Sequence, residues 1–360
     1  MSTSASPDTA GTQDAVSWPD PARRAAFGRW LAEVGPRHGL QPQTLAPASA
    51  DASFRRYLRI QGDAASFIVM DAPPPHEDVR PFVHVAALIG AAGLHAPRVL
   101  EADPAQGFLL LDDLGRRLYL DALREADPAE ADRLMRDATA ALVQWQLRVP
   151  ADTLPPYDGA LLARELALFP EWCVRGKHHI SWGDRERAIW DRTCRLLIDA
   201  ALAQPTVAVH RDWMPRNLMV ADPNPGILDF QDAVRGPVTY DLASLLRDAF
   251  VSWDEERELD WAVRAWQAAR DAGVPLGEAF GSDFGGFWRA LEWMGLQRHL
   301  KVLGIFCRLE LRDAKPQYAR DLPRFFGYAT RVAHRYAELR PLLALLEPMS
   351  GPLVQRGLTF

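Results

Sequence analysis

One irregular segment in the second half of the chain constrains the fold more than any other feature. Residues 209–220 read V-H-R-D-W-M-P-R-N-L-M-V, and residues 227–232 read I-L-D-F-Q-D. Polar residues alternate with short apolar pieces, which predicts a loop carried between short strands. Asp212 and Asn217 are five residues apart, and Asp229 follows directly on a predicted strand at residues 226–228. The pattern indicates that this loop brings three oxygen-bearing side chains together.

The rest of the chain divides into a strand-bearing front and a helical back. In the front, Phe27, Trp30, Leu31 and Val34 have helical spacing, and the helix is expected to stop near Gly35. Strands are predicted within residues 48–62 and at 67–70, 97–100 and 108–111, with a helix at 84–93. The predicted helices of the back are residues 127–147, 161–174, 184–202, 242–250, 255–272, 284–309 and 322–345. This order predicts an α+β fold.

Length and pattern together suggest how the 360 residues are organised. The polar first 17 residues predict a disordered leader. We expect a small antiparallel-sheet lobe over residues 18–111, a hinge at 112–115, and a large, mostly helical lobe over 116–360 that carries the irregular segment.

Composition excludes several classes of partner. Acidic residues outnumber basic ones 47 to 41, giving a formal charge of −6, and no basic stripe suggests binding to nucleic acid. No apolar run is long enough to span a bilayer, and the polar first residues do not predict a secretory signal, so no membrane partner is expected. The three cysteines form no CxxC pair, which favours a reduced, cytoplasmic protein.

The spacing H-R-D, four residues, N is that of a kinase catalytic loop. Phosphoryl transfer needs a carboxylate near the acceptor hydroxyl and oxygen ligands that hold Mg²⁺ against the phosphates of ATP. Asp212 suits the first role, and Asn217 and Asp229 suit the second. Each of these residues alone is more often a turn former or helix cap, but the joint pattern favours function. His210 is predicted to be structural, bonding backbone near Asp229.

The motifs resemble those of the aminoglycoside phosphotransferase and choline kinase superfamily. The continuation from D-F-Q-D at 229–232 through Gly236 to Y-D-L-A-S at 240–244 is similar to that superfamily. The resemblance implies a protein-kinase-like fold of two lobes, with Asp241 supporting the catalytic loop. It also implies that residues 109–115, L-L-L-D-D-L-G, form a hinge that binds adenine through backbone groups.

A narrower resemblance rests on D-A-S-F-R-R-Y at 51–57, I-V-M-D-A-P at 68–73, and the two catalytic segments. These are similar to the bacterial anomeric kinases of N-acetylmuramic acid and N-acetylglucosamine. The resemblance covers residues 20–345. It implies ATP and Mg²⁺ as cofactors and transfer of phosphate to the C1 hydroxyl of an amino sugar in peptidoglycan recycling.

The front lobe departs from the general kinase pattern. The expected phosphate-covering turn at residues 49–54 has no glycine, Met70 stands where a lysine is usual, and no lysine precedes Lys177. Arg55 or Arg56 is a candidate to reach the phosphates instead. Glu77 and Asp78 have no assigned partner and are most simply surface acids. The predicted nucleotide-binding residues are Ser49, Ser53, Phe54, Arg55, Arg56, Leu111, Asp112, Asp113 and Leu114.

Candidates for binding the acceptor lie near the catalytic loop and on a late helix. Arg216 suits a substrate carboxylate or the transferring phosphate, and Gln231 suits a sugar hydroxyl or the magnesium shell. On the predicted helix at 284–309, Arg298 and His299 could face a sugar, together with Glu292, Trp293 and Lys301. A solvated helix face is an equally good interpretation of those five residues.

Two other functions remain open at this point. One is a kinase of the same superfamily that acts on an aminoglycoside, choline or homoserine. The other is a nucleotide-sensing pseudokinase, suggested by the missing lysine and glycine loop but opposed by the intact set of Asp212, Asn217 and Asp229. The sequence does not decide the anomer, the preferred sugar, ATP against GTP, or the oligomeric state.

Overall fold

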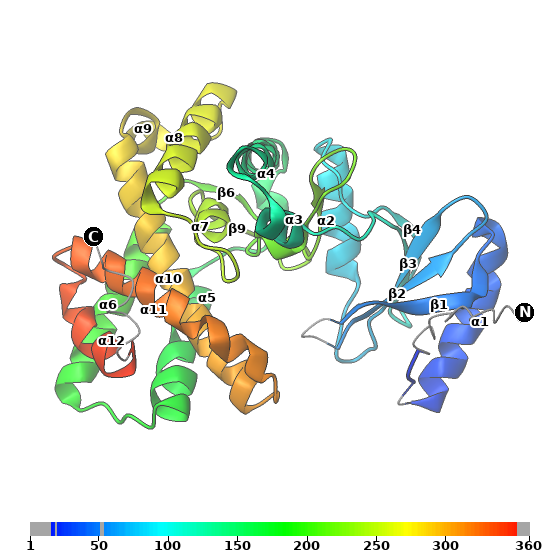
Figure 1. Cartoon of the computed structure of the whole chain (residues 1–360), viewed down its shortest axis with the longest axis horizontal. Helices are drawn as coiled ribbons and strands as arrows, with labels where there is room; N and C mark the ends of the chain where they lie inside the picture. The colour runs from blue at the N-terminus through cyan, green and yellow to red at the C-terminus, as the bar shows by residue number, and fades with distance from the viewer. Residues whose placement is uncertain (1–15, 19, 51–53, 351–360) are drawn as a thin grey trace, which may run out of the picture. The chain divides into compact units, whose positions relative to one another are not determined.

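The structure is a computed structural model that describes residues 16–18, 20–50 and 54–350. Contacts within the chain divide it into two compact units. The first contains the chain up to Ala87 together with Ala96–Gly115, and the second contains Leu88–His95 and the chain from Arg116 onward. Figure 1 shows the elements of each unit.

The first unit is built on a five-stranded antiparallel sheet with the order β1-β2-β3-β5-β4. Leu58, Val69 and Leu110 lie side by side across the three middle strands. One helix, α1, packs its apolar residues on the same core (Figure 1). The elements are α1 (Pro21–His38), β1 (Gln41–Ala50), β2 (Arg56–Gln61), β3 (Ser66–Asp71), α2 (Arg80–Ala91, which runs into the second unit), β4 (Val99–Asp103) and β5 (Phe108–Asp112).

Both ends of helix α1 are set by residues that commonly begin and end helices. The side chain of Asp20 accepts the N–H of Ala22, and Gly39 ends the helix with a φ of 59°. The predicted stop near Gly35 is wrong, because Pro36 lies inside the helix and the Gly39 N–H bonds back to the Gly35 carbonyl. The apolar stripe at Phe27 is buried as predicted, and each such side chain contributes about 1.5–3 kcal/mol.

The second unit is mostly helical and is organised around α10, a helix of 28 residues (Figure 1). Its helices are α3 (Tyr119–Glu125), α4 (Pro128–Arg148), α5 (Gly159–Leu168), α6 (Asp184–Leu202), α7 (Tyr240–Leu246), α8 (Glu255–Ala272), α9 (Gly277–Ser282), α10 (Phe284–Leu311), α11 (Leu322–Arg335) and α12 (Leu343–Ser350). Short 3₁₀ helices are η1 (Ala151–Thr153), η3 (Pro215–Asn217), η4 (Pro316–Asp321) and η5 (Arg340–Leu342).

Three predicted helices differ from the structure in instructive ways. The helix predicted at 161–174 changes after Leu168 into η2 (Phe169–Lys177), a π-helical segment. There Gly304 of α10 lies so close that a Cβ on it would stand 2.4 Å from the Leu168 carbonyl carbon. The helix predicted at 322–345 ends at Arg335, and that predicted at 242–250 ends at Leu246. Short α3 and α9 were not predicted.

Two small antiparallel pairs complete the second unit. Strand β6 (Thr206–Val209) pairs with β9 (Val234–Pro237), and β7 (Leu218–Met219) pairs with β8 (Gly226–Ile227). These strands flank or lie within the irregular segment at residues 209–232. Within the described ranges, no helix is long and apolar enough to cross a membrane.

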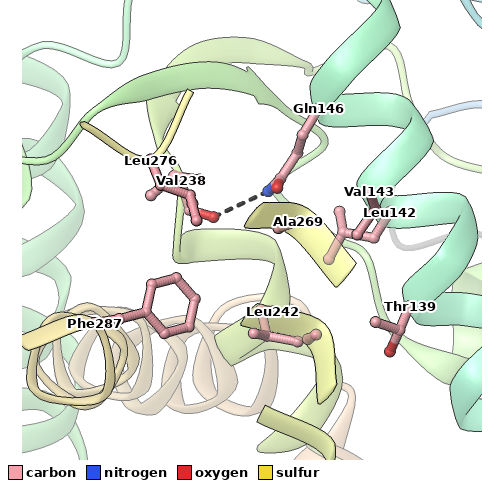
Figure 2. Close-up of a pocket in the computed structure, with 10 residues that line it drawn as sticks. Thr139, Leu142, Val143, Gln146, Val238, Leu242, Ala269, Leu276 and Phe287 are labelled. Carbon is pink, nitrogen blue, oxygen red and sulfur yellow. Dashed lines mark hydrogen bonds between the residues drawn. The ribbon is translucent and has the colours of Figure 1, made fainter. Parts of the chain in front are cut away.

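A pocket in the second unit lies apart from the predicted site residues. Its wall is mainly apolar, and Gln146 Nε2 donates to the Val238 carbonyl across it at 2.9 Å (Figure 2). No titratable side chain lines this pocket, so it offers no group for acid, base or metal chemistry. The lining residues are Thr139, Leu142, Val143, Gln146, Val238, Leu242, Ala265, Ala269, Leu276 and Phe287.

Candidate active site

His210 joins the two halves of the irregular segment. Its ring is fully buried, and Nε2 lies 3.0 Å from the Leu228 carbonyl oxygen, which can only accept. Nδ1 then accepts the N–H of Asp212 at 3.3 Å, so one neutral tautomer makes both bonds. Burial lowers the pKa of His210 to about 4. A neutral ring therefore ties the residue before Asp229 to the backbone of Asp212.

Asp241, in the first turn of α7, holds the same loop from the other side. Its carboxyl oxygens accept the N–H groups of His210 at 2.7 Å and Arg211 at 2.9 Å. Arg211 has a φ of 77°, a conformation that is costly for a residue with a side chain. Burial raises the pKa of Asp241 to about 7, against the effect of the two N–H donors. The two bonds fix the backbone that leads into Asp212.

A buried group of charges, which we name the loop network, holds the Arg211 side chain. Glu165 of α5 accepts from Arg211 Nη2 at 2.7 Å and from Lys301 Nζ of α10 at 2.9 Å. Its other carboxyl oxygen accepts from the Tyr157 hydroxyl and, at 3.2 Å, from Gln297 Nε2. Burial alone would raise the pKa of Glu165, but the charges of Lys301 and Arg211 lower it to about 2. Sequence reasoning missed this network because its members are far apart in the chain.

Asn217 and Gln231 flank Asp229. Asn217 Nδ2 donates to the Asp212 carbonyl at 3.0 Å and lies 3.4 Å from Asp229 Oδ2. Gln231 Nε2 donates to Asp229 Oδ1 at 2.9 Å, and the Leu228 N–H donates to the Asn217 carbonyl at 2.9 Å. Asp212 and Asp229 are both partly exposed. The structure thus brings Asp212, Asn217 and Asp229 together on adjoining loops, and Gln231 joins them.

These residues can be tested for their fit to a hard divalent cation. Asn217 directs its amide N–H groups at the Asp212 carbonyl and the Asp229 carboxylate, which leaves its amide oxygen available as an acceptor. Mg²⁺ prefers oxygen ligands and usually takes only one or two carboxylates together with phosphates and waters. Within the part of the chain that the structure describes, no group of three His, Cys, Asp or Glu side chains could hold a metal. The site therefore fits Mg²⁺ only with ligands that a nucleotide supplies.

The interpretation of helix α10 as a solvated face is wrong, since its polar residues are buried. Glu292 and His299 have no exposed surface, and Arg298 is 2% exposed. The His299 ring stacks on Tyr328, with centroids 4.9 Å apart, and Arg298 Nη2 lies 3.7 Å from the Met214 sulfur. The burial of His299 and Arg298 argues against direct contact with a ligand, and their place in the acceptor site stays a prediction.

Arg216 lies at the edge of the catalytic loop, in η3. Its guanidinium is 5.6 Å from the Phe250 ring centroid, and Nη1 donates to the Tyr318 hydroxyl at 3.1 Å. The side chain is half-buried, so it remains open to a ligand.

In the first unit, Arg55 and Arg56 have different surroundings. Arg56 donates to the buried Asp71, donates Nη1 to the Ser17 carbonyl at 2.8 Å, and stacks over Trp18 at 4.3 Å. Arg55 Nε instead lies 3.7 Å from Glu77 Oε2, and Glu77 also accepts the Phe54 N–H at 3.3 Å. The donors of Arg56 thus already serve the fold, which favours Arg55 over Arg56 as the residue that reaches the phosphates.

The positions of Phe54, Ser53 and Ser49 give no evidence for or against contact with a nucleotide. Phe54 is 64% exposed and stacks on His76, with centroids 4.7 Å apart. Ser53 and the side chain of Ser49 lie outside the described residues.

The predicted hinge begins inside the sheet. Leu111 belongs to β5, opposite Ile68 of β3. The Asp112 N–H bonds to the Arg98 carbonyl at 3.2 Å, and Leu114 follows where the strand has ended. The Asp113 carboxylate accepts from Arg59 Nε at 2.5 Å, the Ser66 hydroxyl at 2.7 Å and the Gly115 N–H at 3.0 Å. The side chain of Asp113 is thus committed to the fold.

Comparison with known proteins decides the family. The model described as "Phosphotransferase enzyme family" matches residues 44–276. The chain belongs to the phosphotransferase enzyme family. The phosphotransferase activity predicted from the sequence is thereby confirmed.

Two relatives cover most of this phosphotransferase. A Pseudomonas aeruginosa protein named N-acetylmuramate/N-acetylglucosamine kinase is 54% identical over 308 residues, which is 85% of this chain and 89% of the relative. A Neisseria meningitidis protein of the same name is 44% identical over 341 residues, 94% of this chain and 99% of the relative.

Solved structures support the predicted fold. An ethanolamine kinase from Plasmodium vivax has a TM-score of 0.61 at 9% identity, covering 86% of this chain and 88% of its own. A choline kinase from Streptococcus pneumoniae has a TM-score of 0.58 at 9% identity, covering 85% and 99%. The predicted α+β, protein-kinase-like fold is therefore confirmed.

Proposed function

We propose that this phosphotransferase transfers the γ-phosphoryl group of ATP to the C1 hydroxyl of N-acetylmuramate or N-acetylglucosamine. The observation that carries the reaction is the grouping of Asp212, Asn217 and Asp229 on a loop that His210 and Asp241 hold in place. The sugar acceptors are supported by the names of the relatives at 54% and 44% identity. None of the contacts described above favours an aminoglycoside, choline or homoserine as acceptor, or a pseudokinase.

Asp212 acts in this proposal on the acceptor hydroxyl. Its carboxylate accepts the hydroxyl proton while the sugar oxygen attacks the γ-phosphorus and the bond from that phosphorus to the bridging oxygen of ADP breaks. An anomeric hydroxyl is more acidic than an ordinary alcohol, so a carboxylate of ordinary basicity is sufficient. The bond from His210 to the Asp212 N–H orients this residue without charging the ring.

Asn217 and Asp229 would hold Mg²⁺, and Gln231 would orient the Asp229 carboxylate. A magnesium ion bound there neutralises charge on the phosphates of the nucleotide. The bond from Asn217 to the Asp212 carbonyl uses an amide N–H and leaves the amide oxygen available as a ligand. Gln231 therefore belongs to the metal site rather than to the sugar site.

The nucleotide is bound in this proposal by residues of the first unit. Arg55 takes the place of the missing lysine, since Glu77 lies 3.7 Å from its Nε, as a glutamate pairs with the lysine in many kinases. The backbone of Leu111, Asp112, Asp113 and Leu114 is proposed to bind the adenine. The domain limits predicted from the sequence, and action in the cytoplasm within peptidoglycan recycling, also remain proposals. All three cysteines are free, which suits a reducing compartment.

The test is ADP release with Mg-ATP and a panel of acceptors, corrected for release without acceptor. We expect turnover with N-acetylmuramate and N-acetylglucosamine and none with glucose, kanamycin or choline. Asp212→Ala should lower kcat at least about 1,000-fold, as loss of positioning and base together implies. Asp222→Ala, at an exposed position in the hairpin after β7, is the control and should keep wild-type kcat. Release with choline or kanamycin instead would contradict the proposal.

A further inference from the structure

A cluster of polar and aromatic side chains lies beside the catalytic loop and has no assigned role. We name it the guanidinium cluster: Arg216, Ser252, Tyr318, Arg324 and Tyr328. Arg324 Nη1 donates to the Ser252 hydroxyl, which is 3.0 Å from the Tyr328 hydroxyl. Arg216 Nη1 donates to the Tyr318 hydroxyl at 3.1 Å. The cluster therefore presents two guanidinium groups among neutral hydroxyls and rings.

Arg216 and Arg324 have less anionic compensation than Arg211 and Arg247 of the same unit. Arg211 has Glu165 at 2.7 Å, and Arg247 has two carboxylates within 3.0 Å. Arg216 has no carboxylate within 4 Å in the described ranges, and Arg324 has only Asp321, at 3.8 Å.

The donors of Arg324 also remain partly unused. Its Nε is buried and has no hydrogen-bond partner among the residues that the structure describes, although the whole side chain is 27% exposed. A buried donor without a partner is unfavourable, because it has lost its hydrogen bonds to water. The Arg324 side chain as a whole is 27% exposed, so an anion can reach it from solvent and offset its charge, which makes the cluster a site for an anionic group.

The cluster is rigidly connected to the reacting loop. Arg216 immediately precedes Asn217, the proposed magnesium ligand. The segment that carries Ser252 is fixed by Asp248, whose fully buried carboxylate accepts the N–H groups of Phe250 at 2.9 Å and Val251 at 3.2 Å. Phe250 in turn lies under the Arg216 guanidinium. A ligand held by the cluster therefore has a defined position relative to Asp212.

One of the two proposed acceptor sugars carries an anionic group that could bind to the guanidinium cluster. N-acetylmuramate differs from N-acetylglucosamine by a lactyl ether that carries a carboxylate. Guanidinium groups bind carboxylates through paired, charge-assisted N–H bonds, and tyrosine hydroxyls can add a further donor. Resting on the proposed function, we propose that Arg324, with Arg216, binds the lactyl carboxylate and sets the preference for the acidic over the neutral amino sugar.

The test compares kcat/KM for the two sugars in Arg324→Gln and in wild-type protein. The ratio of kcat/KM for N-acetylmuramate to that for N-acetylglucosamine should fall 10- to 100-fold, mainly through KM. Arg320→Gln, at an exposed position in η4, is the matched control and should leave the ratio unchanged. An unchanged ratio in Arg324→Gln would overturn the proposal, whether or not both activities fall together.

A chemical control separates recognition of the carboxylate from a general structural effect. The methyl ester of N-acetylmuramate lacks the charge, so wild-type protein should use it 10- to 100-fold less well than the free acid. Arg324→Gln should then lower kcat/KM for the ester by less than threefold, because the contact is already lost. A full additional loss with the ester would contradict the proposal. Wild-type protein that phosphorylates neither sugar would refute the proposed function instead.

Discussion

Two buried ionic groups in the second unit resemble each other in composition but differ in what they support. The loop network connects Glu165 and Lys301 to Arg211, a residue of the catalytic loop. A second group, which we name the helix network, connects three helices to the residue that directly follows α7. Its members are Arg247 after α7, Glu258 of α8, Glu292 of α10, and Arg331 and Arg335 of α11.

The helix network is the more deeply buried of the two. Arg247, Glu258 and Glu292 have no exposed surface, and Arg247 bonds Glu258 at 3.0 Å and Glu292 at 2.9 Å. Burial alone would raise the pKa of Glu292, but Arg247 and its other partners lower it. Buried charge by itself therefore does not mark an active site. The loop network differs because it holds Arg211, which lies in an irregular loop and has a positive φ.

The largest expected effect comes from removing the centre of the helix network. Arg247→Met leaves two buried carboxylates that only the partly exposed Arg331 and Arg335 compensate, so the free energy of unfolding should fall by about 3–5 kcal/mol. Urea unfolding measures this loss. The kcat of the folded fraction should change less than threefold. A large loss of kcat without loss of stability would contradict the claim that the helix network supports folding alone.

The pH dependence of stability should reveal the neutral His210 ring. Its pKa is about 4 in the folded protein and about 6.5 when unfolded, so the unfolded chain binds more protons between these values. The contribution of His210 to stability should therefore fall as pH drops from about 6.5 to about 4, by at most about 3 kcal/mol. The buried His299 adds a slope of the same sign, whereas Asp241, whose pKa is raised to about 7, adds a slope of opposite sign. The stability difference between wild-type protein and His210→Asn should therefore shrink over this pH range in urea titrations, and a constant difference would contradict the assignment.

Neutralising the centre of the loop network should affect catalysis more than folding. Glu165→Gln keeps the shape but leaves the charges of Arg211 and Lys301 close together without compensation. The Arg211 backbone should then shift, and kcat should fall roughly 10- to 100-fold, as small misplacements near a reaction do. Steady-state kinetics on the acceptor sugars measures this effect. Wild-type kcat combined with a large loss of stability would contradict this prediction, because the loop network would then support folding alone, as the helix network does.

The smallest expected effect concerns helix α10, which carries residues of both networks. A Cβ at Gly304 would stand 2.4 Å from the Leu168 carbonyl carbon, three residues after Glu165. Gly304→Ala should push α5 away, cost about 1–3 kcal/mol of stability, and lower kcat less than tenfold. Gly327→Ala, where a Cβ meets nothing within 4 Å, is the control in thermal unfolding. Equal melting temperatures for the two variants would contradict this account of the packing.

The sequence predicted those parts of the fold whose signals are local. Helices α6 and α8 were predicted at their observed limits, because caps and apolar periodicity coincide there. Strand β1 was missed, since its two prolines are unusual in a strand and are tolerated at an edge of the sheet. The catalytic loop was recognised from its spacing. The loop network, the burial of His299 and the separate roles of Arg55 and Arg56 depend on partners distant in the chain, which no local pattern encodes.

The most direct test of the central claim is the position of the transferred phosphate. N-acetylglucosamine labelled with carbon-13 at C1 is phosphorylated with Mg-ATP, and the product is followed by phosphorus-31 NMR. If the site formed by Asp212, Asn217 and Asp229 acts on the anomeric hydroxyl, the new phosphorus signal is split by carbon-13 and is absent with Asp212→Ala. An unsplit phosphomonoester signal, or the same product from Asp212→Ala, would contradict the account.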